Sequence, residues 1–239
     1  LLSGVTDEIG AEKIKLPVDE TGNPDFLYME SYMKNLELVV SSSLTNFKSA
    51  EKNGVSKTID TSDWKNFKIE DLFEKLELKT LKKDFNKTFD VTKVQDNEFS
   101  LPLVNAKHFN NGIMYYGREC DFEASEMTID IVKNGAIATG DVYAQPQKTG
   151  VLWDAYLIKP KAEIKSELVL FFLATTLEKA IKDKFSYDDK CIWPKVKKLS
   201  ISLPITKQNT PDYDYMEKYM DAIFGNAKKS LDALLKSCQ

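Results

Sequence analysis

Apolar residues recur at steps of three and four in two long segments, one near each end of the chain. The apolar stripe covers Met29–Phe47 in the first segment and Met216–Leu234 in the second. This spacing places the apolar side chains on one face of a helix. A Pro-Asp pair precedes each stripe, and an acidic residue there stabilises the positive end of the helix dipole. The pattern predicts two long amphipathic helices, over residues 24–50 and 211–237.

These helices belong to an internal duplication. Residues 14–33 align with residues 201–220 without a gap, and ten of the twenty positions are identical. A predicted strand precedes the helix in each copy, over residues 13–18 and 199–205. The distance between the copies is far longer than the period of a solenoid. The identical residues of the first copy are Ile14, Leu16, Pro17, Pro24, Asp25, Tyr28, Met29, Glu30, Tyr32 and Met33.

Two helices of equal length with matching apolar stripes can bury those stripes against each other. We therefore predict an antiparallel coiled coil, because the chain leaves along one helix and returns along the other. The alternative is that each helix packs on its own domain. The predicted interface residues are Met29, Met33, Leu36 and Val40 in the first helix, and Met216, Met220, Ile223 and Leu231 in the second.

Short apolar segments separated by polar turns fill the region between the helices. Such spacing is typical of a compact β-rich domain, which we place at residues 60–205. The predicted fold class is therefore α+β, with one β-rich domain flanked by two long helices. A strand and a helical turn are predicted between Trp64 and Phe73, and a buried helix over residues 166–184. The other predicted strands are residues 100–104, 113–116, 127–132, 136–139 and 151–158, with polar loops at residues 105–112 and 140–150.

The composition, with 42% hydrophobic and 29% charged residues, is ordinary for a globular protein. A net charge of −4 argues against nucleic-acid binding, but the charge is unevenly distributed. Residues 64–205 carry 22 basic and 21 acidic side chains, whereas the rest of the chain carries 11 and 16. The acidity is therefore concentrated in the repeat copies and termini, and the charge no longer excludes a DNA-binding β-rich domain.

Cysteine and histidine usage excludes several kinds of site. Cys120, Cys191 and Cys238 are odd in number and widely spaced, which supports neither a disulfide framework nor a zinc site. We therefore expect a reducing, cytoplasmic location and no metal. His108 is the only histidine, which argues against Ser-His-Asp chemistry, and we expect it to be a loop residue. The chain begins at Leu1 without a methionine, directly before a repeat copy, so we expect a longer protein.

The two polar loops hold side chains that can read DNA. Asn and Gln pair with adenine in the major groove, and Arg and Lys pair with guanine or phosphate. Asn111 and Asp141 are also turn-forming residues. Arg118 is the only arginine beside 32 lysines. The predicted DNA-binding residues are Asn105, Lys107, Asn110, Tyr116, Arg118, Tyr143, Gln145, Gln147, Lys148 and Lys190.

The order of these motifs resembles the DNA-specificity (S) subunits of type I restriction-modification systems and of related type II systems. The motifs are LPLVNAKHFNNGIMYY, GAIATGD with YAQ, FFLATTLEKAI, FSYDDKCIWPKV, ISLP and PDYDYMEKYM, in that order. The resemblance implies that residues 1–23 end a preceding recognition domain and that residues 60–205 form a target-recognition domain. It also implies that the two predicted helices are spacers that set the distance between recognition domains.

The same resemblance implies a non-catalytic protein that binds double-stranded DNA. Its expected partners are a methyltransferase subunit, a restriction subunit, and a second copy or half-subunit. S-adenosylmethionine, Mg and ATP are expected only in those partners, with no cofactor in this chain. The sequence agrees, because it contains neither an (N/D)PP(Y/F) methyltransferase tetrapeptide nor a phosphate-binding loop.

Two alternatives remain open from the sequence. One is a coiled-coil adaptor that binds proteins and never DNA, for which no salt-dependent DNA binding is expected. The other is the C-terminal specificity module of a fused restriction-methylation enzyme. For the DNA-binding reading, Gln145→Ala is expected to lose binding at one base position, whereas Lys148→Ala should weaken binding uniformly.

Overall fold

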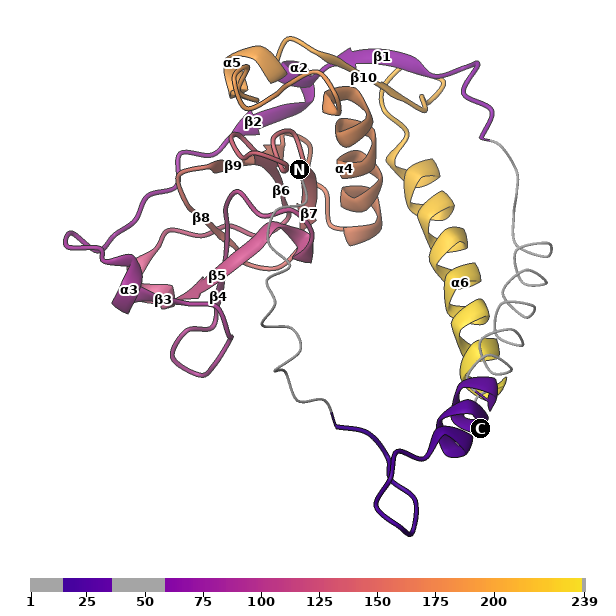
Figure 1. Cartoon of the computed structure of the whole chain (residues 1–239). Helices are drawn as coiled ribbons and strands as arrows, with labels where there is room; N and C mark the ends of the chain where they lie inside the picture. Colours follow the sequence, from indigo (N-terminus) through magenta and orange to yellow (C-terminus); the bar gives the residue numbers. More distant parts are fainter. Residues whose placement is uncertain (1–14, 36–58, 238–239) are drawn as a thin grey trace. The chain divides into compact units, whose positions relative to one another are not determined.

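The structure of the chain is a computed structural model that describes residues 15–35 and 59–237 (Figure 1). It divides into two compact units, Leu1–Lys57 with Gly225–Gln239, and Thr58–Phe224. Within the described ranges, no helix is both long enough and apolar enough to span a membrane.

The larger unit is built on a four-stranded antiparallel sheet with the strand order β2-β9-β6-β7. One face of this sheet is apolar, because every second residue of β6 and β7 is aliphatic and joins the main core cluster. Helix α4 (Glu167–Ile181) packs against this face (Figure 1). Its buried residues recur at helical spacing, as in Leu170, Leu173 and Leu177. The strands are β2 (Phe73–Lys75), β6 (Thr128–Val132), β7 (Val142–Gln145) and β9 (Ala155–Pro160).

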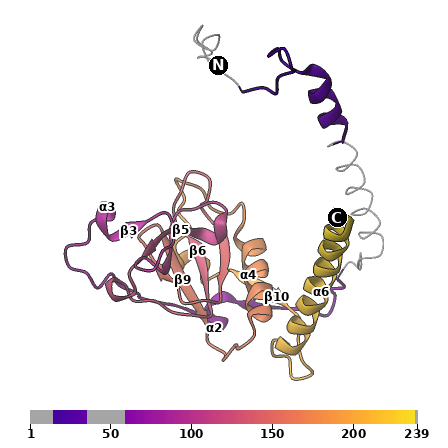
Figure 2. The ribbon, with the colours of Figure 1, turned by 90° about the horizontal axis from the view of Figure 1, so that it is seen from below.

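A second four-stranded sheet has the order β3-β5-β4-β8, in which only β4 and β8 are parallel. It lies on the side of α3 (Lys87–Asp90), and the first sheet lies between it and α4 (Figure 2). A smaller cluster that includes Leu101, Leu103 and Phe122 forms its core. The elements are β3 (Val91–Thr92), β4 (Leu101–Val104), β5 (Ile113–Gly117) and β8 (Gly150–Val151), with 3-10 turns η2 (Asn110–Gly112) and η3 (Glu119–Asp121).

A two-stranded antiparallel sheet joins the beginning and the end of the larger unit. Strand β1 (Lys65–Lys68) pairs with β10 (Ser200–Leu203). The short helices α2 (Ile69–Leu72) and α5 (Trp193–Val196) lie directly after β1 and before β10. Chain segments that are far apart in the sequence therefore meet here, close to the predicted boundaries of the β-rich domain.

The duplication is visible in the geometry of both copies. An isolated bridge joins Val18 to Pro24, and the equivalent bridge joins Ile205 to Pro211. In each copy the aspartate after the second proline caps the helix start. The Asp25 carboxylate accepts a hydrogen bond from the backbone N–H of Tyr28 at 2.8 Å, and the equivalent bond in the second copy is 2.9 Å. The repeated sequence therefore forms the same turn and the same helix start twice.

The two predicted long helices differ in how much of each is described. Residues 26–35 are helical in the first copy, and Leu36 and Val40 lie outside the described residues. In the second copy α6 runs over Tyr213–Ser237. The structure does not test the predicted pairing of the two helices, which stays a prediction.

The predicted interface residues have unequal environments. Met216 is fully buried in the main core cluster of the larger unit, and Met220 packs against that cluster. This part of the α6 stripe is therefore covered by the β-rich domain, which corrects the expectation that it faces a second helix. Further along the helix Ile223 and Leu231 are exposed, as is Met33 in the first copy, whereas Met29 is half-buried.

Three sequence-based assignments need correction. Residues 136–139 form a turn and not a strand, because Gly140, with φ +86°, lets the chain reverse and donate to the Val132 carbonyl at 3.0 Å. The predicted loop 140–150 contains β7, in which the apolar Val142 and Ala144 alternate with polar residues. The many polar residues of this segment made a loop the expected structure. Residues 15–18 form only the isolated bridge at Val18.

Candidate nucleic-acid interface

The face of the first sheet opposite α4 carries a row of polar side chains. Thr128 pairs in register with Gln145, and Asp130 pairs with Tyr143, so all four side chains point to this face. Thr128, Asp130 and Gln145 are fully buried, and the loop before β5, residues 105–112, lies over Asp130 and Gln145. The hydroxyl of Thr128 and both carboxyl oxygens of Asp130 have no hydrogen-bond partner among the described residues.

That covering loop adopts an unusual backbone conformation. Phe109, Asn110 and Asn111 have φ values of 65°, 49° and 52°, and Gly112 follows at 73°. Positive φ is rare for residues other than glycine, although asparagine tolerates it best. The Asn111 side chain holds the loop on β7 by donating to the Ala144 carbonyl at 3.0 Å. Phe109 in this bend is 72% exposed.

A hydrogen-bonded cluster fixes the start of the loop to β7. The Asp141 carboxylate accepts from the Tyr143 hydroxyl at 3.0 Å and lies 2.6 Å from Nδ1 of His108. The Tyr143 oxygen in turn accepts from the backbone N–H of Phe109 at 2.9 Å. Burial raises the pKa of Tyr143, and burial together with the charge of Asp141 raises the pKa of Asp130 well above its usual value. The predicted reader Tyr143 is therefore held within the fold by both of its hydrogen bonds.

An open groove of about 350 Å³ lies beside this loop and brings predicted DNA-binding residues together. Tyr116, Gln147 and Lys148 line it, together with Gln95 and Glu119, and Ile113 connects it to the loop. The exposed Lys148 forms an ion pair of 2.7 Å with Glu119. A solvent-exposed pair of this kind is weak, so the lysine can exchange its partner for a phosphate. Lys107 and Asn110 are exposed on the adjoining loop.

Two of the predicted base readers lie inside the fold. Asn105 is 3% exposed, and its side-chain oxygen accepts from the backbone N–H of Asp154 at 2.8 Å. Gln145 is fully buried beneath the loop. A base edge cannot reach either side chain in this conformation, so the structure favours a structural role for both. Lys190 is exposed between α4 and α5 and does not line the groove.

Arg118 is enclosed by acidic groups. Its guanidinium lies 2.7 Å from the Glu98 carboxylate and 3.3–3.4 Å from those of Asp90 and Asp121, and it stacks on the Phe99 ring at 4.2 Å. The Arg118 pKa is raised, chiefly by the hydrogen bond to Glu98. A cation with this many carboxylate partners is poorly placed to attract a phosphate, so the structure favours a structural role for Arg118 over the predicted contact with DNA.

Arg118→Met is expected to lower the melting temperature by several degrees, because it removes one of the cations beside the buried carboxylate of Asp90. DNA affinity of the folded protein should stay unchanged. Thermal melting and DNA binding should be measured beside Lys148→Ala, for which we expect the reverse pattern. Weaker DNA binding of Arg118→Met at an unchanged melting temperature would identify Arg118 as a DNA contact.

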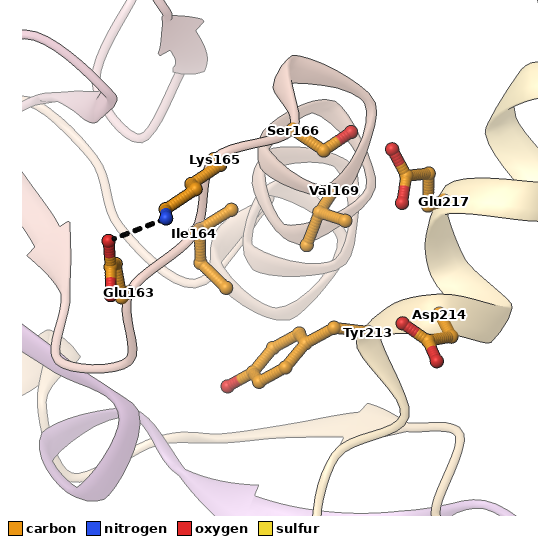
Figure 3. A pocket seen from close by; sticks show the side chains of 8 residues that line it. All are labelled: Glu163, Ile164, Lys165, Ser166, Val169, Tyr213, Asp214 and Glu217. Carbon is orange, nitrogen blue, oxygen red and sulfur yellow. Dashed lines mark ion pairs between the residues drawn. The ribbon is translucent and has the colours of Figure 1, made fainter.

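A second groove lies between the start of α4 and the start of α6 (Figure 3). Glu163, Asp214 and Glu217 contribute three carboxylates to its lining, and its single cation, Lys165, is paired with Glu163 at 3.2 Å. A surface of this charge repels phosphate. The groove beside Lys148 is therefore the better candidate for DNA.

The sequence interpretation missed the buried polar row beneath the loop. Thr128 and Asp130 occupy alternate positions of an otherwise aliphatic strand, TIDIV. That alternation is a detectable signal for a sheet face that is not part of the apolar core. The contribution of Gln95 to the groove has no comparable signal, because its segment carries no regular pattern.

Comparisons with known proteins place these residues in a family context. Residues 61–235 match the family described as "Type I restriction modification DNA specificity domain". The chain is 26% identical over 210 residues to the type II restriction enzyme specificity subunit S.BcgI of Heyndrickxia coagulans, and the match covers 87% of this chain and 57% of that relative.

Similar solved structures include the S subunit of a type I restriction-modification system from M. genitalium, with a TM-score of 0.49 and 13% identity over 87% of this chain and 54% of that one. The HsdS subunit from Thermoanaerobacter tengcongensis gives a TM-score of 0.45 and 8% identity over 87% and 49% of the two chains. The chain thus spans about half the length of the relatives it matches.

Proposed function

Because the chain belongs to the type I restriction-modification DNA specificity domain family, we propose that it recognises a DNA sequence as a specificity subunit or as part of one. The single observation that carries this proposal is the groove beside Lys148, at which residues from the predicted polar loop 140–150 and from β5 meet. It offers Lys148 for a phosphate contact and two glutamines, Gln95 and Gln147, for base edges.

We further propose that the chain itself is non-catalytic and acts in the cytoplasm on double-stranded DNA. A methyltransferase subunit, and in a complete complex a restriction subunit, would carry out the chemistry and hold S-adenosylmethionine, Mg and ATP. Because the match covers only 57% of the relative S.BcgI, we propose that a second recognition half is supplied by another chain or by another part of the same protein.

DNA binding with a steep dependence on salt concentration tests the proposal. Each lysine that contacts a phosphate adds about one unit to the slope of log affinity against log salt. We expect Lys148→Ala and Lys107→Ala each to reduce that slope by about one unit and to weaken binding to all sequences equally. Fluorescence anisotropy with a labelled duplex measures both effects.

Lys165→Ala is the matched control, because it removes the same charge from an exposed lysine in the acidic groove. Its slope should equal that of the unmodified chain. Equal reductions by all three substitutions would show a non-specific charge effect, and binding without salt dependence would remove the groove from consideration as a DNA surface.

A further inference from the structure

The amide side chains of Asn111, in the loop, and of Gln145, buried beneath it, hold each other in fixed orientations. The Asn111 amide nitrogen donates to the Ala144 carbonyl at 3.0 Å and to Oε1 of Gln145 at 3.2 Å. The Gln145 nitrogen donates to the backbone carbonyl of Asn111 at 2.6 Å. A backbone carbonyl can only accept a hydrogen bond, so neither amide can be turned over without losing a bond. The network therefore defines Oε1 of Gln145 as an acceptor.

This acceptor determines how the next side chain is presented. Gln147 donates one N–H to Oε1 of Gln145 at 3.0 Å. A glutamine amide has two N–H donors and one carbonyl. Gln147 is exposed and lines the groove, so its second N–H and its carbonyl oxygen are available there. The Asn111–Gln145 pair thus fixes which ends of Gln147 face a ligand.

The backbone that carries Gln147 is also held on both sides. The buried Thr149 hydroxyl donates to the backbone carbonyl of Gln147 at 2.9 Å, and Thr149 and Ser125 exchange two backbone hydrogen bonds. The backbone N–H of Met127 donates to the Pro146 carbonyl at 3.1 Å. A side chain on a fixed backbone with one amide hydrogen bond already made loses little conformational freedom on binding.

We propose that Gln147 reads an adenine base in the major groove, and that Gln145 and Asn111 are positioning residues for it. The proposal rests on the proposed function and deepens it. Adenine offers the acceptor N7 beside the donor N6, which complements one N–H and one carbonyl. Guanine offers two acceptors, N7 and O6, at the same places, so the side-chain carbonyl of Gln147 would face another acceptor. The geometry therefore selects adenine over guanine.

The test is a selection from duplexes with a randomised central segment, made with the chain alone and with its methyltransferase. We expect the unmodified chain to enrich a motif that contains adenine at a position where Gln147→Ala accepts all four bases. Discrimination at that position should fall by about 5- to 100-fold, the range for one bidentate base contact. Lys148→Ala should keep every base preference.

A chemical probe separates a direct contact from an indirect one. Placing 7-deazaadenine at the assigned position removes N7, so it should weaken binding of the unmodified chain and leave Gln147→Ala unaffected. The proposal is overturned if Gln147→Ala weakens the base preference at a position that is not adenine, or if it weakens no base preference. Enrichment of no motif by the unmodified chain would overturn the proposed function itself, which is a different result.

The positioning role has its own readout. Gln145→Met keeps the length of the side chain and removes its amide, so Gln147 loses its fixed partner. We expect the preference for adenine at that one position to weaken, with all other positions and the salt slope unchanged. An unchanged preference for adenine in a folded Gln145→Met protein would show that the amides of Gln145 and Asn111 only support the fold. If this buried substitution prevents folding, the exposed Gln147→Ala variant still decides the main proposal.

Discussion

Gly112→Ala is expected to destabilise the larger unit by about 2–4 kcal/mol. A Cβ atom at this position would lie 2.4 Å from Oδ2 of Asp130 and 2.9 Å from Cδ2 of Tyr143. Neither neighbour moves easily, because Asp130 is buried and Tyr143 is held by two hydrogen bonds. Crowding of this kind typically costs about 1–3 kcal/mol. The φ of +73° adds about 1 kcal/mol for any residue with a Cβ.

Gly140→Ala is the matched control for this experiment. Gly140 has a similar φ of +86°, but its added Cβ would meet only the Ile181 side chain at 3.4 Å, an ordinary contact. Urea unfolding of both variants therefore separates crowding from backbone strain. We expect Gly140→Ala to lose about 1 kcal/mol or less. Equal losses for the two variants would contradict the close approach of the loop to Asp130.

Local pattern was sufficient to predict the elements whose side chains alternate clearly. The strands at residues 100–104, 113–116 and 127–132 and the helix at 166–184 all have counterparts in the structure. The duplicated helix starts were also predictable, because Pro-Asp specifies the same cap in both copies. In these segments the local preference and the tertiary environment agree, so the local signal is reliable.

The arrangement of the candidate site depends on contacts between distant residues. Gln145 was expected to read bases because of its residue type, but the loop 34 residues before it in the sequence covers it. Arg118 was expected to contact DNA for the same reason, and its carboxylate partners lie up to 28 residues away. Residue type indicates what a side chain can bind, whereas tertiary packing decides which partner it meets.

Packing also changes the role of the polar loop. Its asparagines were expected to form turns or to contact DNA; Asn111 lies in the turn η2, as expected, and its side chain also connects the strained loop to β7 and Gln145. The loop covers polar side chains of the first sheet but does not cover Gln147, which is exposed. Gln147 therefore reaches the groove because the loop does not cover it, whereas Gln145 is covered and cannot.

Asp130→Asn is expected to raise the free energy of unfolding at neutral pH, by about 1.4 kcal/mol for each unit by which the folded pKa of Asp130 exceeds its unfolded value, because asparagine has no proton to bind. The Asp130 carboxyl is fully buried without a hydrogen-bond partner among the described residues. Burial, and secondarily the charge of Asp141, raise its pKa in the folded state. The folded state therefore binds this proton more tightly than the unfolded state, so stability falls as the pH rises above the unfolded pKa of about 3.9. Asparagine does not titrate, so the variant should lose this slope.

Asp90→Asn provides a control of opposite sign. Hydrogen bonds from Lys82 and from the backbone of Asn86 lower the pKa of Asp90, so its contribution is present above the unfolded pKa and is lost as the pH falls. The Asp90 variant should therefore be less stable than the parent at neutral pH, and the difference should disappear in acid. Urea unfolding of the parent and both variants from about pH 2 to pH 8 gives the two slopes, because the Asp90 contribution is lost only below the unfolded pKa of about 3.9. Because burial and the charge of Asp141 both oppose ionisation of the Asp130 carboxyl, a parallel pH dependence of the parent and Asp130→Asn would contradict its burial beneath the loop.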